Sequence, residues 1–286
     1  MDPVPVLTTA RVTIVAGKGG VGKTTVTAVL ARAAADAGLR ALIVELDGKP
    51  VLGDLAGDVP VQVISAPLAL EEYLREHGFG RVARRLSSSG VIDVVATAAP
   101  GIDDIVVLGK IKQLERSGAW DVIVVDGPAA GHAVTFLTSA AGLHDAVRGG
   151  PIRAQADEVL ELLRDPDRAQ VVLVTLPETT PVNELIETAY ALEDRVGVRL
   201  GPVVVNGVDA GDDVPDPKDV ALPPDDGGVL VRAALFRRAR RERQRDEIER
   251  LSSELALDQW HLPLLAMAGL GADDVGVLAG SLWSGR

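Results

Sequence analysis

The chain of 286 residues carries a formal net charge of −12, and 47% of its residues are apolar although only 3% are aromatic. It contains no cysteine, which excludes disulfides, cysteine-bound zinc, iron–sulfur clusters and thiol chemistry. The acidic balance weighs against nonspecific binding to nucleic acid or to an anionic membrane. The core must be built from Val, Leu, Ile and Ala, a composition that suits a parallel β-sheet buried on both faces.

The N-terminal part of the chain predicts a strand, a glycine-rich loop and a helix in direct succession. Residues 1–9 contain two prolines and no periodicity, so we expect a short flexible arm there. Residues 12–16 form an apolar run, and residues 22–37 follow with a helical pattern. Between them GKGGVGKTT fits the strand–GxxxxGK[ST]–helix context of a phosphate-binding P-loop. The alternative is an ordinary glycine-rich turn.

The residues of this loop suit a nucleoside triphosphate with Mg²⁺. Glycines lack a Cβ, so successive backbone N–H groups can converge on an anion, and the N-terminus of the following helix adds about half a positive charge. Lys23 is placed to reach the β- and γ-phosphates, the Thr24 hydroxyl to bind Mg²⁺, and Thr25 to contact the α-phosphate. The candidate nucleotide-binding residues of the loop are Gly17, Gly19, Gly20, Val21, Gly22, Lys23, Thr24 and Thr25.

A second predicted strand, residues 41–45, is followed by Leu46 and Asp47. Ligands of an open parallel sheet bind beyond the carboxyl ends of its strands, so we expect Asp47 at the same edge as the P-loop. The alternative is that Asp47 and Gly48 form a turn.

The strongest strand signal is the apolar run that ends at Asp126. The elements predicted before it are a strand at residues 61–64, a helix at 68–86, a loop at 87–90 and a helix at 102–117. Lys110 and Lys112 of this last helix are either solvated or functional. An acid at the carboxyl end of such a strand is typical of the Walker B carboxylate, which reaches Mg²⁺ through a water.

The segment after Asp126 contains Gly127, Gly131 and His132. We expect a glycine-hinged loop that orders or relaxes with hydrolysis. His132 either bonds within that loop or is an ordinary surface residue.

The second half of the chain continues the alternation of strands and helices. We expect a helix at 154–164, a strand at 171–175, a helix up to about residue 195 and a strand at 202–206. Asn206 ends that strand, and its amide suits the donor and acceptor edge of adenine, although Asn206 with Gly207 also favours a turn.

Three further elements are expected before the C-terminus. Residues 209–228 are acidic and rich in proline, which predicts a mobile loop. Residues 229–257 form a long helix whose arginines are interleaved with acids, more typical of a solvated charged helix than of a nucleic-acid patch. A last strand at 260–265 and a helix at 271–283 complete the chain.

The motif GKGGVGKT, with a second lysine at Lys18, resembles the deviant Walker A motif of the P-loop class that contains ArsA, the tail-anchored-protein targeting ATPase, MinD, ParA and the nitrogenase iron protein. In that class this lysine reaches the partner's nucleotide across a dimer interface; the alternative is a solvated loop lysine. Asp126, Gly131 and His132 resemble the switch II pattern DTAPTGH of ArsA-like proteins. PGIDDIVVLGKIKQLERSGAWDVIVVD and VTLPETTPVNELIE also look like ArsA-like sequences.

This resemblance implies one three-layer α/β/α P-loop domain across residues 1–286, with a mostly parallel sheet. It implies Mg-ATP hydrolysis by a dimer, formed with a second copy or with a paralogue as in short actinobacterial ArsA-like ATPases. It places Asn206, Pro263 and Leu264 around adenine and Gly131 near the nucleotide. At switch I, ArsA-like proteins read DPAH, and their aspartate positions the attacking water. The resemblance therefore implies that Asp47 orients this water as a general base, or binds Mg²⁺. The sequence departs from this pattern after Asp47, where Gly48, Lys49 and Pro50 follow.

Without cysteine, neither the thiol site for arsenite nor the CxxC zinc clamp of the targeting factor can form, and two methionines do not make a Met-rich groove. We expect a cytoplasmic dimeric ATPase that acts as a nucleotide-dependent switch on an unidentified protein client. Its catalytic residues would be Lys18, Lys23, Asp47 and Asp126.

We expect no binding of nucleic acid and no stable membrane insertion. The apolar helices at 68–117 and 135–163 are the candidate client surface. The alternatives are a ParA/MinD-type positioning ATPase and a nonhydrolytic ATP-binding regulatory subunit of a paralogue heterodimer.

Overall fold

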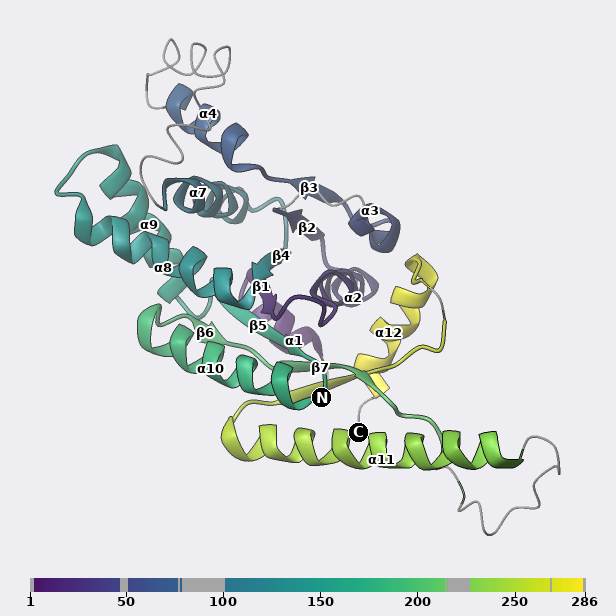
Figure 1. Ribbon diagram of the computed structural model, residues 1–286. Helices are drawn as coiled ribbons and strands as arrows, with labels where there is room; N and C mark the ends of the chain where they lie inside the picture. Colours follow the sequence, from purple (N-terminus) through teal and green to yellow (C-terminus); the bar gives the residue numbers. More distant parts are fainter. Residues whose placement is uncertain are drawn as a thin grey trace.

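The fold is organised around one eight-stranded parallel sheet with the strand order β3-β2-β4-β1-β5-β7-β8, in which β6 pairs with β5 (Figure 1). The computed structural model describes residues 3–46, 51–76, 78, 101–213, 215, 227–267 and 269–284. The strands are β1 Val12–Gly17, β2 Ala41–Glu45, β3 Val61–Val63, β4 Val122–Ala129, β5 Ala169–Thr175, β6 Arg199–Leu200, β7 Val203–Val208 and β8 Gln259–Pro263.

Helices cover both faces of this sheet. The described helices are α1 Pro3–Thr9, α2 Lys23–Asp36, α3 Val51–Ala56, α4 Ala66–Glu76, α7 Ile102–Arg116, α8 Ala130–Ala146, α9 Pro151–Arg164, α10 Thr179–Arg195, α11 Gly227–Glu254 and α12 Ala272–Ser284. One apolar cluster joins α1, α2, α3 and α12 to the sheet, and a second joins α4, α7, α8, α9, α10 and the C-terminal end of α11 to its other face. The predicted three-layer α/β/α architecture is therefore confirmed.

The central strands are apolar along their whole length because both faces are buried. In β1, Ile14 belongs to the cluster under α7 and α8, whereas the next residue, Val15, belongs to the cluster under α2. Side chains alternate between the two faces of a strand, so a strand that is covered on both sides needs apolar residues at successive positions.

The expectation of a flexible arm over residues 1–9 needs correction, because residues 3–9 form α1. Leu7 is fully buried in the apolar cluster under α2, and the Val6 carbonyl accepts a hydrogen bond of 3.0 Å from Gln170 Nε2. The short helix is held by tertiary contacts, which no local pattern in the first nine residues indicates.

The predicted hinged loop after Asp126 is also replaced by regular structure. Strand β4 continues to Ala129, and α8 begins at the next residue. A Cβ on Gly127 would lie 2.4 Å from the Val15 carbonyl oxygen. Glycine at this position therefore lets β4 stay close beside β1, where Gly17 pairs with Ala129 after a register irregularity.

The predicted positions of the longer helices are confirmed to within a few residues. The helix predicted over 68–86 is described as α4 up to Glu76, while residues 77 and 79–86 and the loop predicted at 87–90 lie outside the described residues. Of the acidic segment 209–228, only 209–213, 215 and the start of α11 are described. No helix in the described ranges is long and apolar enough to cross a membrane.

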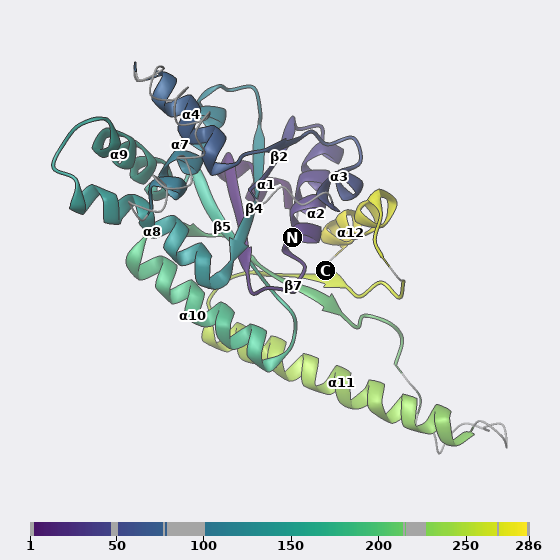
Figure 2. The ribbon, with the colours of Figure 1, turned by 45° about the horizontal axis from the view of Figure 1, so that its top comes forward.

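Figures 1 and 2 show that the N-terminal half of α11 projects beyond the rest of the molecule. Its exposed apolar side chains are those of Val229, Leu230, Leu235 and Phe236. Arg237 binds both carboxylate oxygens of Asp209, at 2.7 and 2.8 Å, which ties this half of the helix to the segment after β7.

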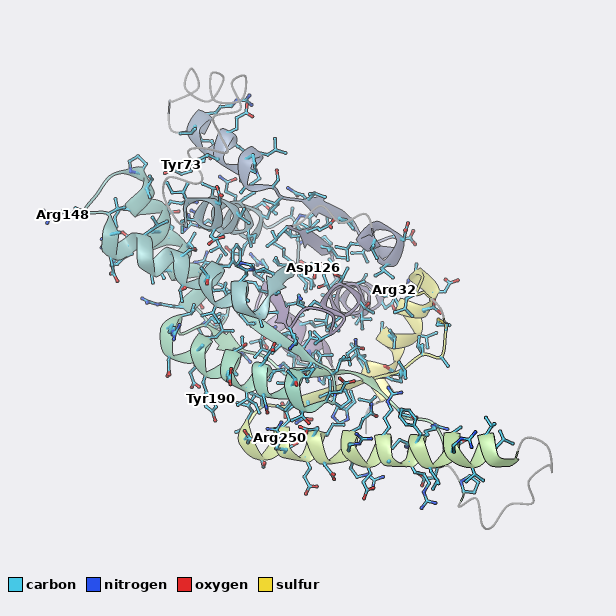
Figure 3. The ribbon with its side chains drawn as sticks, in the orientation of Figure 1. Arg32, Tyr73, Asp126, Arg148, Tyr190 and Arg250 are labelled. Carbon is cyan, nitrogen blue, oxygen red and sulfur yellow. The ribbon has the colours of Figure 1, made fainter. Side chains whose placement is uncertain are left out.

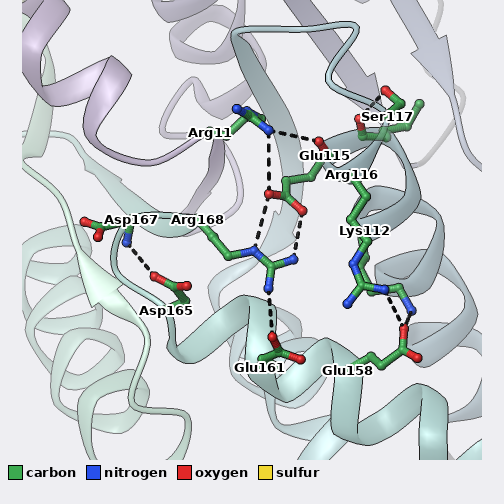
Figure 4. A network of polar contacts seen from close by, with 11 residues as sticks. Arg11, Lys112, Glu115, Arg116, Ser117, Glu158, Glu161, Asp165, Asp167 and Arg168 are labelled. Carbon is green, nitrogen blue, oxygen red and sulfur yellow. Dashed lines mark hydrogen bonds and ion pairs between the residues drawn. The ribbon is translucent and has the colours of Figure 1, made fainter.

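A buried polar network lies at the amino-terminal edge of the sheet (Figure 4). Arg168, next to the start of β5, binds both carboxylate oxygens of Glu115 on α7, at 2.8 and 3.3 Å. Lys112, on the same helix, is 5% exposed and pairs with Glu158 of α9. Lys112 is thus a buried structural residue, neither a solvated nor a catalytic lysine, whereas Lys110 pairs with Glu72 at the α4–α7 contact.

Candidate functional site

The glycine-rich loop joins β1 to α2 at the carboxyl edge of the sheet. Gly20 and Gly22 have φ angles of 86° and 90°, in the left-handed region that favours glycine. A Cβ on Gly22 would also lie 2.3 Å from Asn206 Nδ2, and a Cβ on Gly17 would lie 2.4 Å from the Val174 carbonyl oxygen. The loop conformation therefore requires glycine for both its dihedral angles and its packing.

The outer side of the loop is open, while its inner side is fixed. Gly19 and Gly20 are exposed, and Val21 is buried in the apolar cluster under α2. Lys23, the first residue of α2, donates a hydrogen bond of 3.1 Å from Nζ to the Lys18 carbonyl oxygen across the loop. Thr25 follows in the same first turn and is half-buried. An exposed loop backbone at the N-terminus of a 14-residue helix is the arrangement that binds phosphate.

Asp126, labelled in Figure 3, lies against the first turns of α2. Thr24 donates a hydrogen bond of 2.9 Å to Asp126 Oδ2, and Thr27 donates one of 3.4 Å to Oδ1. Asp126 is 8% exposed and Thr27 is fully buried. The structure thus brings together Thr24 and Asp126, the two predicted ion-binding residues that it describes.

Thr27 was not predicted, although its spacing of three residues from Thr24 places both hydroxyls on one side of the helix. The described residues contain no cluster of three or more His, Cys, Asp or Glu that could hold a metal ion. One hydroxyl and one carboxylate nevertheless fit Mg²⁺, which binds oxygen ligands and takes the remainder from phosphate and water. Asp47 lies outside the described residues, as do Gly48, Lys49 and Pro50.

Lys18 forms an ion pair with Glu184 of α10 in its own chain. The two side chains are 35% and 39% exposed, so the pair lies at the surface and is open to exchange. Sequence reasoning did not predict Glu184, which is separated from Lys18 by 166 positions and belongs to no local motif.

Asn206 contacts the P-loop directly. Its Nδ2 donates a hydrogen bond of 2.9 Å to the Val21 carbonyl oxygen. Gly207 adopts a left-handed φ of 71°, and the register between β7 and β8 shifts at this point. Asn206 therefore places its amide at the loop. The alternative of a turn at Asn206 and Gly207 does not hold, because β7 continues through both residues to Val208.

Pro263 and Leu264 lie at the same edge of the sheet, at the end of β8, the strand next to β7. Pro263 pairs with Val208, and the Leu264 N–H donates a hydrogen bond of 2.8 Å to the Val208 carbonyl. Leu264 is 49% exposed.

Gly131 and His132 are exposed in the first turn of α8, immediately after β4. Every predicted site residue that the structure describes thus lies at or near the carboxyl edge.

One charged group beside this edge has a shifted pKa. Burial raises the pKa of Asp104 in the first turn of α7, the neighbouring Asp103 raises it further, and His132 opposes these effects. The start of α7 packs against α8, where a Cβ on Gly101 would lie 3.4 Å from Ser139 Cβ.

Comparison with known proteins adds a family assignment to this geometry. A family model described as anion-transporting ATPase matches residues 10–148. ATPase BagA of Mycobacterium tuberculosis is 32% identical over 225 residues, which cover 70% of this chain and 66% of BagA. The arsenical pump-driving ATPase of Escherichia coli is 27% identical over 271 residues, which cover 92% of this chain and 43% of the pump ATPase. The chain therefore spans about two thirds of the length of BagA and less than half of the pump ATPase.

Proposed function

We propose, since this chain belongs to the ArsA-like ATPase family, that it binds Mg-ATP and hydrolyses it to ADP and phosphate. The observation that carries this proposal is the contact between Thr24 at the start of α2 and Asp126 in the C-terminal half of strand β4. A hydroxyl and a carboxylate held together beside an open glycine-rich loop suit the ion and the phosphates of one ligand.

Each described residue has a distinct task in this proposal. The backbone of Gly19, Gly20 and Gly22 would bind the phosphates, and the Lys23 ammonium group would neutralise phosphate charge. Thr24 would bind Mg²⁺ directly and Asp126 through a water, and the ion would offset the negative charge that builds up on the phosphoryl group.

Asn206 supports the choice of adenine as the base. Its Nδ2 is held by Val21, so its amide orientation is fixed relative to the P-loop. The exposed Leu264 and the adjacent Pro263 provide an apolar surface on the neighbouring strand end. An amide beside an apolar surface can both select and stack a purine.

We further propose that the active form is a dimer in which Lys18 contacts the nucleotide of the partner subunit. Lys18 is kept in the same chain by a surface ion pair with Glu184, which contributes little free energy and can be exchanged for a phosphate contact. A lysine delivered in this way would act on γ-phosphate charge in the manner of an arginine finger.

In this proposal the dimer acts as a switch on a protein client, not as an arsenite-binding subunit. The apolar side chains of α7, α8 and α9 pack in the core, as Leu108, Leu137 and Leu163 illustrate, so these helices do not supply the client surface expected from their sequences. Leu68 on α4 is 66% exposed. Among the described residues, a client surface in this region would therefore have to involve α4.

A nonhydrolytic regulatory subunit is the second candidate. It is favoured by Gly48, Lys49 and Pro50, which stand where ArsA-like proteins carry the remainder of switch I. In the hydrolytic proposal Asp47 orients the attacking water despite these neighbours. A ParA/MinD-type role would require ATP-dependent binding to DNA or lipid, which the net charge of −12 disfavours.

ATP turnover as a function of protein concentration tests these proposals, with wild type beside Lys18→Ala and Lys23→Ala. A specific activity that rises with concentration and falls to background in both variants supports a dimeric ATPase. If wild type binds ATP but its turnover stays at background, the nonhydrolytic regulatory subunit replaces the dimeric ATPase as the proposed function. Wild type that neither binds nor hydrolyses ATP would refute both.

A further inference from the structure

Glu45 is a buried acid at the carboxyl end of β2, the strand next to β4. Its exposed fraction is 4%, and it is the register partner of Asp126 in the parallel pairing of β2 with β4. Neighbouring strands of a sheet lie about 4.8 Å apart. Glu45 is therefore adjacent to the carboxylate that the Mg-ATP proposal uses.

The side chain of Glu45 is on the same face of the sheet as the P-loop helix. Ala41 and Ile43 of β2 belong to the apolar cluster under α2, whereas the intervening Leu42 belongs to the other cluster. Side chains alternate along a strand, so Glu45 shares the face of Ala41 and Ile43. Asp126 is also on this face, because it accepts hydrogen bonds from α2.

The two acids differ in how their oxygens are satisfied. Asp126 accepts hydrogen bonds from Thr24 and Thr27, one at each carboxylate oxygen. Glu45 Oε1 is buried and has no hydrogen-bond partner in the part of the chain that the structure describes. Buried polar atoms are almost always hydrogen-bonded, to protein or to ordered water. An unpartnered carboxylate oxygen beside a candidate ion site points to a donor that the described residues do not supply.

We propose that Glu45 is a positioning residue for the Mg²⁺ ion of the bound nucleotide. Its carboxylate would accept a hydrogen bond from a water molecule that coordinates the ion. This inference rests on the proposed binding of Mg-nucleotide. Mg²⁺ keeps several of its waters when it binds to proteins, and outer carboxylates that hold such waters govern affinity for the ion.

The inference is specific to the metal and does not concern the nucleotide alone. Glu45 is on β2, whereas the phosphate-binding backbone is in the loop after β1. Loss of Glu45 should therefore weaken Mg²⁺ binding in the ternary complex and leave binding of metal-free ADP unchanged. A purely structural Glu45 would affect both or neither.

The test is a titration of Mn²⁺ into protein with saturating ADP, with free Mn²⁺ followed by electron paramagnetic resonance. Glu45→Gln keeps the size of the side chain and removes its charge, and it should weaken Mn²⁺ binding about tenfold. Glu45→Asp keeps the charge but retracts the carboxylate by one methylene, and it should give a smaller loss. The matched control is Glu115→Gln, a second buried acid that lies at the opposite edge of the sheet, which should leave Mn²⁺ affinity unchanged.

The outcomes separate this inference from the function on which it rests. Asp126→Asn serves as a reference for damage to the ion site. One outcome is that Asp126→Asn weakens Mn²⁺ binding while the Mn²⁺ affinity of Glu45→Gln stays within twofold of that of wild type. In that case Glu45 does not hold the ion, and only this inference is overturned. If wild type shows no Mn²⁺-dependent binding of ADP, the proposed function and this inference both fail. Glu45→Met, an apolar side chain of similar length, serves in place of Glu45→Gln if the latter does not fold, with the same expected loss.

Discussion

The lysine that distinguishes this P-loop, Lys18, is paired with Glu184 of α10 in the same chain. The proposed dimer needs Lys18 to face the partner's nucleotide, so the pair with Glu184 must open when the dimer closes. A surface ion pair contributes about 0–1 kcal/mol, which is small enough to be displaced by a phosphate contact. The pair would therefore hold Lys18 in place in the free chain without locking it there.

Glu184→Gln should make the closed dimer easier to form. A dimer of two copies opens two such pairs when it closes. Removal of contacts worth at most about 1 kcal/mol each therefore predicts up to about a thirtyfold lower protein concentration for half-maximal ATP turnover. Turnover at saturating protein concentration should stay the same, because Glu184 is not part of the proposed reaction. The measurement is specific activity across a protein dilution series. A neighbouring exposed acid on the same helix, Glu187, gives the control Glu187→Gln. An unchanged midpoint for Glu184→Gln would show that the ion pair does not compete with dimer closure.

Gly22→Ala should distort the nucleotide site and destabilise the fold. Gly22 has a φ of 90°, and a Cβ there would meet Asn206 Nδ2 at 2.3 Å. Backbone strain of this kind costs about 1–3 kcal/mol, and displacement of Asn206 should also weaken ADP binding. The matched variant is Gly19→Ala in the same loop, where a Cβ would meet no atom within 4 Å.

Thermal unfolding without nucleotide separates these two glycines. Gly19→Ala should unfold at nearly the wild-type temperature, and Gly22→Ala clearly below it. Equal midpoints for the two variants would mean that the loop relaxes around Gly22 and that the close packing against Asn206 is not required.

The features that could be predicted from the sequence are those encoded within a few consecutive residues. The P-loop is defined by nine adjacent residues, and the strand before Asp126 is indicated by an uninterrupted apolar run. Both positions could therefore be predicted from local pattern. Their meeting at one edge of the sheet follows from the geometry of parallel sheets. Asn206 was identified in the same way, from the strand that precedes it.

The features that were missed depend on contacts between distant segments. Helix α1 is held by burial of Leu7, and β4 extends past Asp126 because Gly127 fits against the Val15 carbonyl. Glu45 is the last residue of a predicted strand, and only the pairing of β2 with β4 places it beside Asp126. In each case the decisive neighbour is far away in the sequence, and neither hydrophobic periodicity nor residue type identifies it.

Glu115→Gln should lower stability without affecting nucleotide binding. Glu115 is 6% exposed and receives two hydrogen bonds from Arg168, whose pKa it raises. Weakening of buried charged hydrogen bonds costs about 1–3 kcal/mol. Glu161 contacts the same arginine at 3.5 Å but is 67% exposed, so Glu161→Gln should cost less than about 0.5 kcal/mol.

Chemical denaturation of both variants, with ADP affinity measured in parallel, checks this prediction. Equal losses for Glu115→Gln and Glu161→Gln would contradict the view that burial determines the energy of the network at this edge. A change in ADP affinity would show that the network is coupled to the P-loop at the other end of the strands.

Asp209 should make stability depend on pH in the acid range. Hydrogen bonds from Arg237, with the positive charge of its guanidinium group, lower the pKa of Asp209 to about 2, although its partial burial acts in the opposite direction. An unfolded aspartate titrates near 3.9. The folded state binds the proton less readily than the unfolded state, so the stabilisation is complete above about pH 5 and is lost as the pH falls from there towards 2.

Asp209→Asn removes this contribution and is the matching variant. The difference in free energy of unfolding between wild type and Asp209→Asn, obtained from urea titrations between pH 6 and pH 2.5, should be constant near neutral pH and shrink below pH 4. Asp213, an exposed partner of Arg241 with 93% of its side chain accessible, provides the control Asp213→Asn, for which no such narrowing is expected. Parallel curves for wild type and Asp209→Asn would mean that Arg237 does not hold this carboxylate in solution, and that this contact does not attach the projecting half of α11 to the segment after β7.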